Sequence, residues 1–266
     1  MKDDLTLLFV GCDGYTGFTK LAIAEFKEWD VQKINASHTE SVERDDTCDI
    51  LTPEFFDKPT DIMPLGRDIL VPRILKVIRE HIRTPYILWV MSDQLYKEPN
   101  INKFKSWIEV MKTFNITNLK VSIHGTPGEE NGNEIVHSSK STGIIKWGYK
   151  SPYLVAHHGS IFEKNYLINT LQFTLDSYGN MGYDHEMTYY IGGWFNPARV
   201  ELVKQKNTDN RQIRCAYVTE PRVEIISCLS LGKLTECGYE YIQNCSLIEA
   251  DPLKKFKIGE FCPQKL

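Results

Sequence analysis

Short apolar runs alternate with longer amphipathic segments along most of the chain. The apolar runs are typical of buried strands in a parallel sheet, because such strands are covered on both faces and show little polar alternation. The longer segments repeat their apolar residues at helical spacing, which is typical of helices with one face on a core. The strands predicted from these runs are residues 5–10, 31–36, 86–91, 119–123, 153–156, 200–203 and 213–218. The predicted helices are residues 16–29, 68–83, 99–114, 162–176 and 183–191.

This alternation of strands and helices predicts an α/β fold, in which a mixed, mostly parallel sheet of the Rossmann type is flanked by helices. The length is compatible with one large domain or two small ones, and we expect a single domain over residues 1–266. Neither G-x-G-x-x-G nor G-x-x-x-x-G-K-[ST] occurs in the sequence. Their absence argues against a standard dinucleotide-binding fold and against a P-loop.

The net charge and the lack of long apolar runs bear on whether nucleic acids or membranes are partners. The formal net charge is −4 and the pI is about 6.0, so a nucleic-acid binder that depends on a general basic field is not expected. No run approaches the ~20 apolar residues that a membrane-spanning helix needs, and the start of the chain lacks the pattern of a signal segment. We therefore expect a cytoplasmic protein without an integral membrane segment, and peripheral membrane contact stays open.

The seven cysteines are spread along the chain, and they form no C-x-x-C pair. Buried or free thiols in a reducing compartment are their expected state. The spacings of the cysteines between Cys215 and Cys262 fit no standard metal-ligand pattern.

Polar residues follow two of the predicted strands at the point where each strand ends. The first strand is followed by Gly11-Cys12-Asp13-Gly14-Tyr15, and the third by Ser92-Asp93-Gln94. Because ligands collect outside the carboxyl ends of parallel strands, these turns predict a nucleotide-sugar pocket. We expect Asp13 to face a base or ribose, Tyr15 to stack on a nucleobase and Asp93 to face a diphosphate. The alternative for both acids is that each one caps a turn.

A divalent cation at Asp93 is an open alternative. Mg²⁺ and Mn²⁺ are usually held by one or two carboxylates together with substrate phosphates. Asp93 is followed by Gln94 rather than by a second acid. One carboxylate with an amide is a weak cage, so the sequence leaves metal dependence undecided.

Asp184 and Glu186 are the candidates for a general base. They follow a glycine-containing loop and stand where a helix is predicted to begin, a position that the helix dipole favours for any acid. A carboxylate there that faces a pocket is placed to take a proton from an attacking hydroxyl. Side chains two residues apart point to different sides of a helix, so we expect only one of the two acids to serve.

Four further residues are candidates for substrate contacts. His157 and His158 follow a predicted strand and are expected to contact acceptor hydroxyls or a phosphate; their side chains diverge, which argues against one shared metal. Trp194 is expected to form part of an aromatic floor for a sugar ring, with a place in the core as the alternative. Arg67 lies near the start of a predicted helix and could neutralise a diphosphate, with solvated surface as its alternative.

The segment Val10-Gly11-Cys12-Asp13-Gly14-Tyr15, followed by a predicted helix, resembles the opening of GT-A-type bacterial and viral glycosyltransferases of surface-glycan synthesis. In that group a later helix leads to a Tyr-x-Leu-rich strand that ends in an acidic pair and two aromatics. Residues 69–96, which include Tyr86-Ile87-Leu88 and Asp93-Gln94-Leu95-Tyr96, resemble this second block. Residues 153–171 and 183–186 resemble a third block, so the resemblance extends over about residues 5–190.

The resemblance implies a GT-A-like fold, a nucleotide-sugar donor and transfer of a sugar to a glycan or polysaccharide acceptor. It implies that the donor-binding residues include Cys12, Asp13 and Tyr15 near the nucleoside and Asp93 with Gln94 near the diphosphate. The base that it implies is Asp184 or Glu186.

The single domain is expected to have three parts: a nucleotide-binding half of about residues 1–125, an acceptor-binding half of about 126–200 and an irregular C-terminal extension of about 201–266. We expect an inverting displacement with a carboxylate base, and a retaining mechanism is the alternative. Two other functions stay open, namely a sugar nucleotidyltransferase and a non-catalytic carbohydrate- or nucleotide-binding protein on the same fold. Gln94 in place of a second acid is the best support for the non-catalytic reading.

Overall fold

The computed structural model describes residues 1–10, 16–36, 50–51, 66–91, 93–122, 135–140, 142–147, 159–178, 215–219, 222–230 and 233–244. Nine strands within these residues form one sheet. In chain order they are β1 (Leu5–Val10), β2 (Gln32–Asn35), β3 (Ile50–Leu51), β4 (Tyr86–Met91), β6 (Asn118–Lys120), β7 (Ile135–Ser139), β8 (Gly143–Trp147), β9 (Ser160–Glu163) and β10 (Cys215–Val218).

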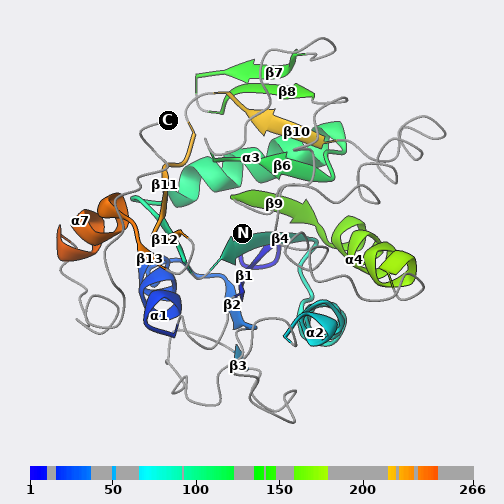
Figure 1. Cartoon of the computed structure of the whole chain (residues 1–266). Helices are drawn as coiled ribbons and strands as arrows, with labels where there is room; N and C mark the ends of the chain where they lie inside the picture. The colour runs from blue at the N-terminus through cyan, green and yellow to red at the C-terminus, as the bar shows by residue number, and fades with distance from the viewer. Residues whose placement is uncertain are drawn as a thin grey trace.

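The strand order across this sheet is β3-β2-β1-β4-β9-β6-β10-β8-β7 (Figure 1). The first four strands in this order are parallel, and β10 is parallel to β6. Among the described strands, β9 and β8 run against the others. The predicted fold class, a mixed and mostly parallel α/β sheet flanked by helices, is therefore confirmed.

Helices cover both faces of the sheet. α1 (Thr16–Glu25) and α3 (Ile101–Phe114) pack on one face, against buried residues that include Leu7 and Leu88. α2 (Gly66–His81) and α4 (Lys164–Tyr178) pack on the other face, against Leu8 and Trp89. Figure 1 shows α1 on one side of β1 and β4, with α2 and α4 on the other. Neighbouring residues of β1 thus face two different cores, which explains why every residue of β1 is buried and all but Thr6 are apolar.

The helix predicted over residues 16–29 ends earlier, at Glu25. Phe26 and Trp29 lie in the turn that follows, with ring centroids 4.9 Å apart in an edge-to-face arrangement. The Trp29 ring also lies 5.0 Å from the ring of Phe104 in α3. Aromatic pairs of this kind contribute about 0.5–1.5 kcal/mol beyond the burial of their area. The helical spacing of the apolar residues predicted a longer helix. We attribute its earlier end to these aromatic contacts, which Phe26 and Trp29 make from the turn.

Two other predicted helices have different boundaries. α2 runs from Gly66 to His81, so it begins and ends two residues before the predicted range of 68–83. α3 begins at Ile101, after Asn100, whose side-chain oxygen accepts hydrogen bonds from the N–H groups of Asn102 and Lys103. An asparagine N-cap of this kind satisfies N–H groups that have no partner within the helix.

Strand β9 was not expected, because residues 162–176 were predicted as one helix. Ser160–Glu163 instead pairs antiparallel with both β4 and β6. The carboxylate of Glu163 accepts hydrogen bonds from the N–H groups of Asn165 and Tyr166 and so caps α4 directly. A strand of four residues that continues directly into a helix is too short to show an alternating pattern of its own in the sequence.

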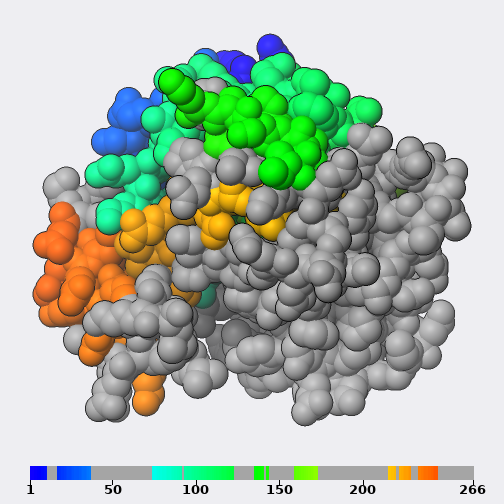
Figure 2. Space-filling view, turned by 90° about the horizontal axis from the view of Figure 1, so that it is seen from above, coloured from blue at the N-terminus to red at the C-terminus, as the bar shows by residue number. Residues whose placement is uncertain are grey.

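The C-terminal region, which was expected to be irregular, contains regular elements besides β10. β11 (Ile225–Ser227) pairs antiparallel with β5 (Gln94–Tyr96), and β12 (Leu229–Ser230) pairs with β13 (Lys233–Leu234). α7 (Glu236–Asn244) follows. The space-filling view places α7 at one side of the molecule and β7 on the face toward the viewer (Figure 2). The elements predicted at 153–156, 183–191 and 200–203 lie outside the described residues.

Two of the described cysteines, Cys215 and Cys228, are buried free thiols, as expected. Cys237 is disulfide-bonded, so the expectation of thiols throughout is wrong there. In the described part of the chain, no helix combines the length and the apolar character that crossing a membrane requires.

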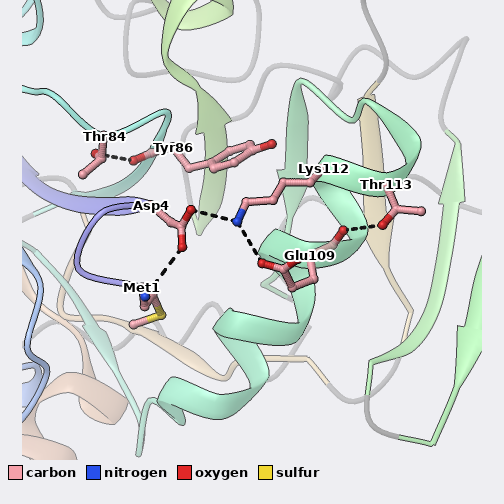
Figure 3. Close-up of polar contacts among 7 residues, drawn as sticks. All are labelled: Met1, Asp4, Thr84, Tyr86, Glu109, Lys112 and Thr113. Carbon is pink, nitrogen blue, oxygen red and sulfur yellow. Dashed lines mark hydrogen bonds and ion pairs between the residues drawn. The ribbon is translucent and has the colours of Figure 1, made fainter.

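Ion pairs join the start of β1 to α3 at the amino edge of the parallel strands (Figure 3). Lys112 Nζ lies 2.8 Å from a carboxylate oxygen of Asp4 and 2.8 Å from one of Glu109. The hydrogen bond from Lys112 lowers the pKa of Asp4. These side chains are partly exposed, so each pair contributes at most about 1 kcal/mol.

Gly159 immediately precedes β9 and has a left-handed backbone, with φ +61°. A Cβ atom at this position would lie 2.5 Å from the Cβ of Ser122 and 2.5 Å from the Cδ1 of Ile225. The backbone conformation and the close packing both require glycine here.

We predict that Gly159→Ala lowers the free energy of unfolding by about 2–4 kcal/mol, as the sum of left-handed strain and overpacking. Gly143→Ala is the matched control, because Gly143 also has a positive φ, of 68°, and this variant should lose about 1 kcal/mol. Urea denaturation of both variants measures the difference. Equal losses would show that the contacts with Ser122 and Ile225 do not constrain residue 159.

Candidate functional site

The carboxyl ends of β1 and β4 lie side by side. The two strands pair in parallel from Leu5 with Tyr86 through to Val10 with Met91. The chain therefore leaves both strands at the same edge of the sheet and at the same level. Residues 11–15 follow one end, and Asp93 with Gln94 follows the other. This is the edge at which ligands collect in open α/β sheets.

Asp93 lies in a turn and Gln94 begins β5, and the C-terminal region holds both in place. The carbonyl of Asp93 accepts a hydrogen bond of 2.8 Å from the N–H of Cys228, and Gln94 pairs with Ser227 across β5 and β11. Gln94 is buried and Asp93 is partly buried. Burial raises the pKa of Asp93 to about 6, against a smaller lowering by a hydrogen bond from its own backbone.

The carboxyl end of β6 lies at the same edge of the sheet as those of β1 and β4, because β4 and β6 are both antiparallel to β9. Ser122 and Val223 form a parallel bridge, and the N–H of Val223 donates to the carbonyl of Val121 at 2.9 Å. The segment 222–228 therefore runs from the end of β6 to the Asp93 turn. We call this stretch the edge segment.

Two basic residues lie where the edge segment meets β6. Lys120 is the last residue of β6 and only 5% exposed. Arg222 begins the edge segment, and its Nε donates to the carbonyl of Thr219 at 2.7 Å. Burial, together with the positive charge of Arg222, lowers the pKa of Lys120 to about 7. Neither residue was a sequence candidate, although a lysine within a predicted buried strand is a signal that could have been used.

A partly buried carboxylate, that of Glu25, connects α1 to β5, the strand that follows Asp93. Glu25, at the end of α1, accepts a hydrogen bond of 2.6 Å from the N–H of Tyr96 in β5 and one of 3.1 Å from the hydroxyl of Tyr241 in α7. Burial raises the pKa of Glu25 from 4.5 to about 8, although both hydrogen bonds act in the opposite direction. Sequence reasoning did not identify Glu25, because a single glutamate at a helix end is typical of solvated surface.

Three of the predicted site residues lie in the described part of the chain. Asp93 and Gln94 stand at the carboxyl edge, as predicted for the donor site. Arg67 lies in the first turn of α2, at the end of that helix distant from the start of β4, and its side chain is not described. The other candidates lie outside the described residues, and their roles stay predictions: Cys12, Asp13, Tyr15, His157, His158, Asp184, Glu186 and Trp194.

Among the described residues, no group of three or more His, Cys, Asp or Glu side chains is placed to hold a metal ion. The donor set at the Asp93 turn is one carboxylate followed by one amide. That set provides fewer oxygen ligands than Mg²⁺ or Mn²⁺ takes from a protein and its waters in a site of its own.

Comparisons with known proteins give structural matches alone. No family model matches the chain, and no curated protein matches it. Solved structures that match include S. aureus TarS, with 10% identity, a TM-score of 0.42, and coverage of 95% of this chain and 42% of that one. A TarS fragment, residues 1–349, matches with 9% identity, a TM-score of 0.37, and coverage of 95% of this chain and 69% of that one. The same fragment in complex with UDP-GlcNAc matches with 10% identity, a TM-score of 0.37, and coverage of 95% and 70%. At these scores the matches assign neither a family nor a ligand to this chain.

We predict that Glu25→Gln changes how stability depends on pH. The pKa of Glu25 is higher in the folded than in the unfolded chain, so the wild type loses stability as pH rises from about 4.5 to about 8. The variant cannot ionise and should lose less over this range, so that it becomes the more stable protein above pH 8. Chemical denaturation at several pH values measures this, with the exposed Glu28→Gln as control. Parallel curves for wild type and Glu25→Gln would contradict the assignment.

Proposed function

We propose that this protein is a glycosyltransferase that moves a sugar from a nucleotide-sugar donor to a glycan or polysaccharide acceptor. The proposal combines the resemblance of the sequence to GT-A-type enzymes with the placement of the predicted donor segments. We propose a nucleotide-binding half of about residues 1–125 and an acceptor-binding half of about 126–200. A cytoplasmic location is part of the proposal, although the disulfide at Cys237 is more typical of an oxidising compartment.

The observation that carries the proposal is the in-register parallel pairing of β1 and β4. It brings the end of β1, which precedes Asp13 and Tyr15, next to the end of β4, which precedes Asp93. A nucleoside bound by residues 11–15 would then have its diphosphate near the Asp93 turn. The arrangement supports one binding edge formed by two segments that are about 80 residues apart in the sequence.

The proposed reaction is a single displacement with inversion at the anomeric carbon. Asp184 or Glu186 takes the proton of an acceptor hydroxyl, whose oxygen then forms a bond to C1 of the donor sugar. The bond between C1 and the phosphate oxygen breaks, and its electron pair leaves with the nucleoside diphosphate. Groups at the carboxyl edge must stabilise the negative charge that develops on this leaving group.

No step of this mechanism is assigned to a metal. A divalent cation at Asp93 stays an alternative, for which Asp93 and Gln94 would supply one carboxylate and one amide oxygen beside the substrate phosphates. Donor binding is instead assigned to Asp93, Gln94 and the segment 11–15, with Arg67 as a further candidate. Acceptor binding is assigned to His157, His158 and Trp194.

A non-catalytic protein that binds a nucleotide or carbohydrate is the second candidate. Gln94 in place of a second acid favours it, because loss of that acid is one way in which such a fold would lose turnover. The transferase should bind and hydrolyse the donor. A non-catalytic nucleotide-binding protein should bind the donor without hydrolysing it.

We predict that at least one nucleoside diphosphate or sugar nucleotide stabilises the protein in a thermal-shift panel of uridine, guanosine, cytidine and adenosine compounds. A ligand at a hundredfold excess over its Kd adds about 2.7 kcal/mol to the free energy of unfolding. The transferase should also hydrolyse one sugar nucleotide slowly without acceptor. Stabilisation without turnover, even with acceptor extracts, would favour the non-catalytic protein, and no stabilisation by any compound would contradict the transferase and any nucleotide-binding protein.

We predict that Asp184→Ala or Glu186→Ala lowers turnover at least about a hundredfold, because a general base contributes about 10²–10⁴-fold. The Kd for the donor should change little, since the base acts on the acceptor. Steady-state rates and donor titrations of both variants separate the two effects. Near-normal turnover in both would refute the assignment of the base.

A further inference from the structure

We infer that the first turn of α7 positions Asp93 for donor binding, and that it acts through Thr235 and Gly238. The inference rests on the proposed glycosyltransferase function, in which the Asp93 turn binds the diphosphate of the donor. It makes Thr235 and Gly238 positioning residues, which act on the donor through Asp93 rather than by contact with it.

Main-chain hydrogen bonds connect the Asp93 turn to the residue before α7. The N–H of Cys228 donates to the carbonyl of Asp93 at 2.8 Å, and the carbonyl of Cys228 accepts from the N–H of Thr235 at 2.9 Å. Cys228 and Thr235 are almost fully buried, with 0% and 1% of their surface exposed. Buried groups that lose such partners pay the full cost of their desolvation. A single residue, Cys228, thus relates the position of Thr235 to that of Asp93.

The hydroxyl of Thr235 joins this connection to α7. It donates to the carbonyl of Ser227 at 2.7 Å and accepts from the N–H of Gly238 at 2.9 Å. Thr235 directly precedes α7 and accepts from the N–H of the third helical residue, which is the bonding of an N-cap. Ser227 pairs with Gln94, the residue after Asp93. One hydroxyl therefore holds the end of the helix and the strand beside Asp93 together.

Gly238 allows α7 to lie directly against Cys228. A Cβ atom at this position would lie 2.7 Å from the Cα of Cys228 and 2.9 Å from the Oγ1 of Thr235. Rotation of a side chain cannot relieve a contact with a Cα atom, so a larger residue would displace the helix. Glycine inside a helix weakens the helix relative to alanine. The sequence thus favours close packing of α7 on Cys228 over the intrinsic stability of the helix.

A second set of contacts connects α7 to the far end of β5. The hydroxyl of Tyr241 donates to one carboxylate oxygen of Glu25 at 3.1 Å, and the other oxygen accepts from the N–H of Tyr96 at 2.6 Å. Figure 1 shows α7 beside α1, the helix that ends at Glu25. The helix is therefore related to β5 at both ends of the strand, to Gln94 through Ser227 and to Tyr96 through Glu25. Two attachments give the first turn of α7 a defined place relative to this strand.

The test compares Thr235→Ala with Thr235→Ser and with a matched control, Glu163→Ala. Alanine removes both hydrogen bonds of the hydroxyl, whereas serine keeps this group and is a favoured N-cap. Glu163 caps α4 and pairs with Tyr86 at the start of β4, which is the opposite edge of the sheet. Each alanine variant loses one helix cap, so the unfolding temperature of each should fall by about 2–4 °C.

Two measurements distinguish positioning from a loss of stability. Hydrogen exchange without ligand reports on the Asp93 turn, and calorimetry with UDP, GDP, CDP and ADP reports on nucleotide affinity. We expect Thr235→Ala to exchange faster than Glu163→Ala in peptides that contain residues 93–97 and 225–228. Its Kd for the nucleotide that the wild type prefers should rise about threefold to thirtyfold, as for coupled members of one hydrogen-bond network. Thr235→Ser and Glu163→Ala should bind within about twofold of wild type.

Gly238→Ala provides a second route to the same displacement, which keeps the inference testable if Thr235→Ala does not fold. The added Cβ forces α7 away from Cys228, while alanine favours the helix itself. Exchange at residues 93–97 and the Kd for the nucleotide should therefore change in the same direction as in Thr235→Ala.

The outcomes separate the inference from the proposed function. Unchanged exchange at residues 93–97 in folded Thr235→Ala and Gly238→Ala would overturn the inference and leave the glycosyltransferase proposal standing. Faster exchange with wild-type nucleotide affinity would also overturn it, because the placement of Asp93 would then not affect the donor. Faster exchange in these variants of a protein whose wild type binds none of the four nucleotides or their sugar derivatives would support the link between α7 and the Asp93 turn and overturn the proposed function.

Discussion

The parallel pairing of β1 with β4 is the constraint on which the rest of the structure depends. Each of the six residues of β1 is buried, and successive residues face different cores, one built by α1 and α3 and the other by α2 and α4. A slip of one residue would exchange the two sets of side chains between the cores, so burial fixes the register strongly. The same register brings the ends at Val10 and Met91 to one level. Packing of the core thus determines where the candidate site is formed.

The two edges of the sheet have different character. At the amino edge, Asp4 and Lys112 form a partly exposed ion pair that costs little desolvation. At the carboxyl edge, burial disfavours the charged forms of Asp93 and Lys120. Burial also disfavours the charged form of Glu25, which accepts a hydrogen bond from β5. Groups of this kind reduce stability, and perturbed pKa values cluster at functional sites, although structural charge networks produce them too. The contrast agrees with the proposal that places the binding site at the carboxyl edge.

The fold class and the strands β1 and β4 could be predicted, because continuous apolar runs bounded by glycine, proline or polar turns are a local signal. Strand β9 could not, since its four residues continue directly into α4 and only pairing with β4 and β6 defines it. Asp93 was identified from its position after a strand. Glu25 was not, because its partners Tyr96 and Tyr241 are 71 and 216 residues away in the sequence. The pairing of Lys120 with Arg222 likewise exists only once the edge segment has folded back on β6.

The central claim is that the carboxyl edge, from the Asp93 turn to the end of β6, binds the nucleotide. Hydrogen exchange of backbone amides, measured by mass spectrometry with and without a saturating nucleoside diphosphate, tests it most directly. The account predicts slower exchange in peptides that contain residues 93–97, 121–122 and 222–228. Slower exchange confined to the opposite edge, around Asp4 and Lys112, or to the β7–β8 hairpin, with these three segments unchanged, would contradict the account.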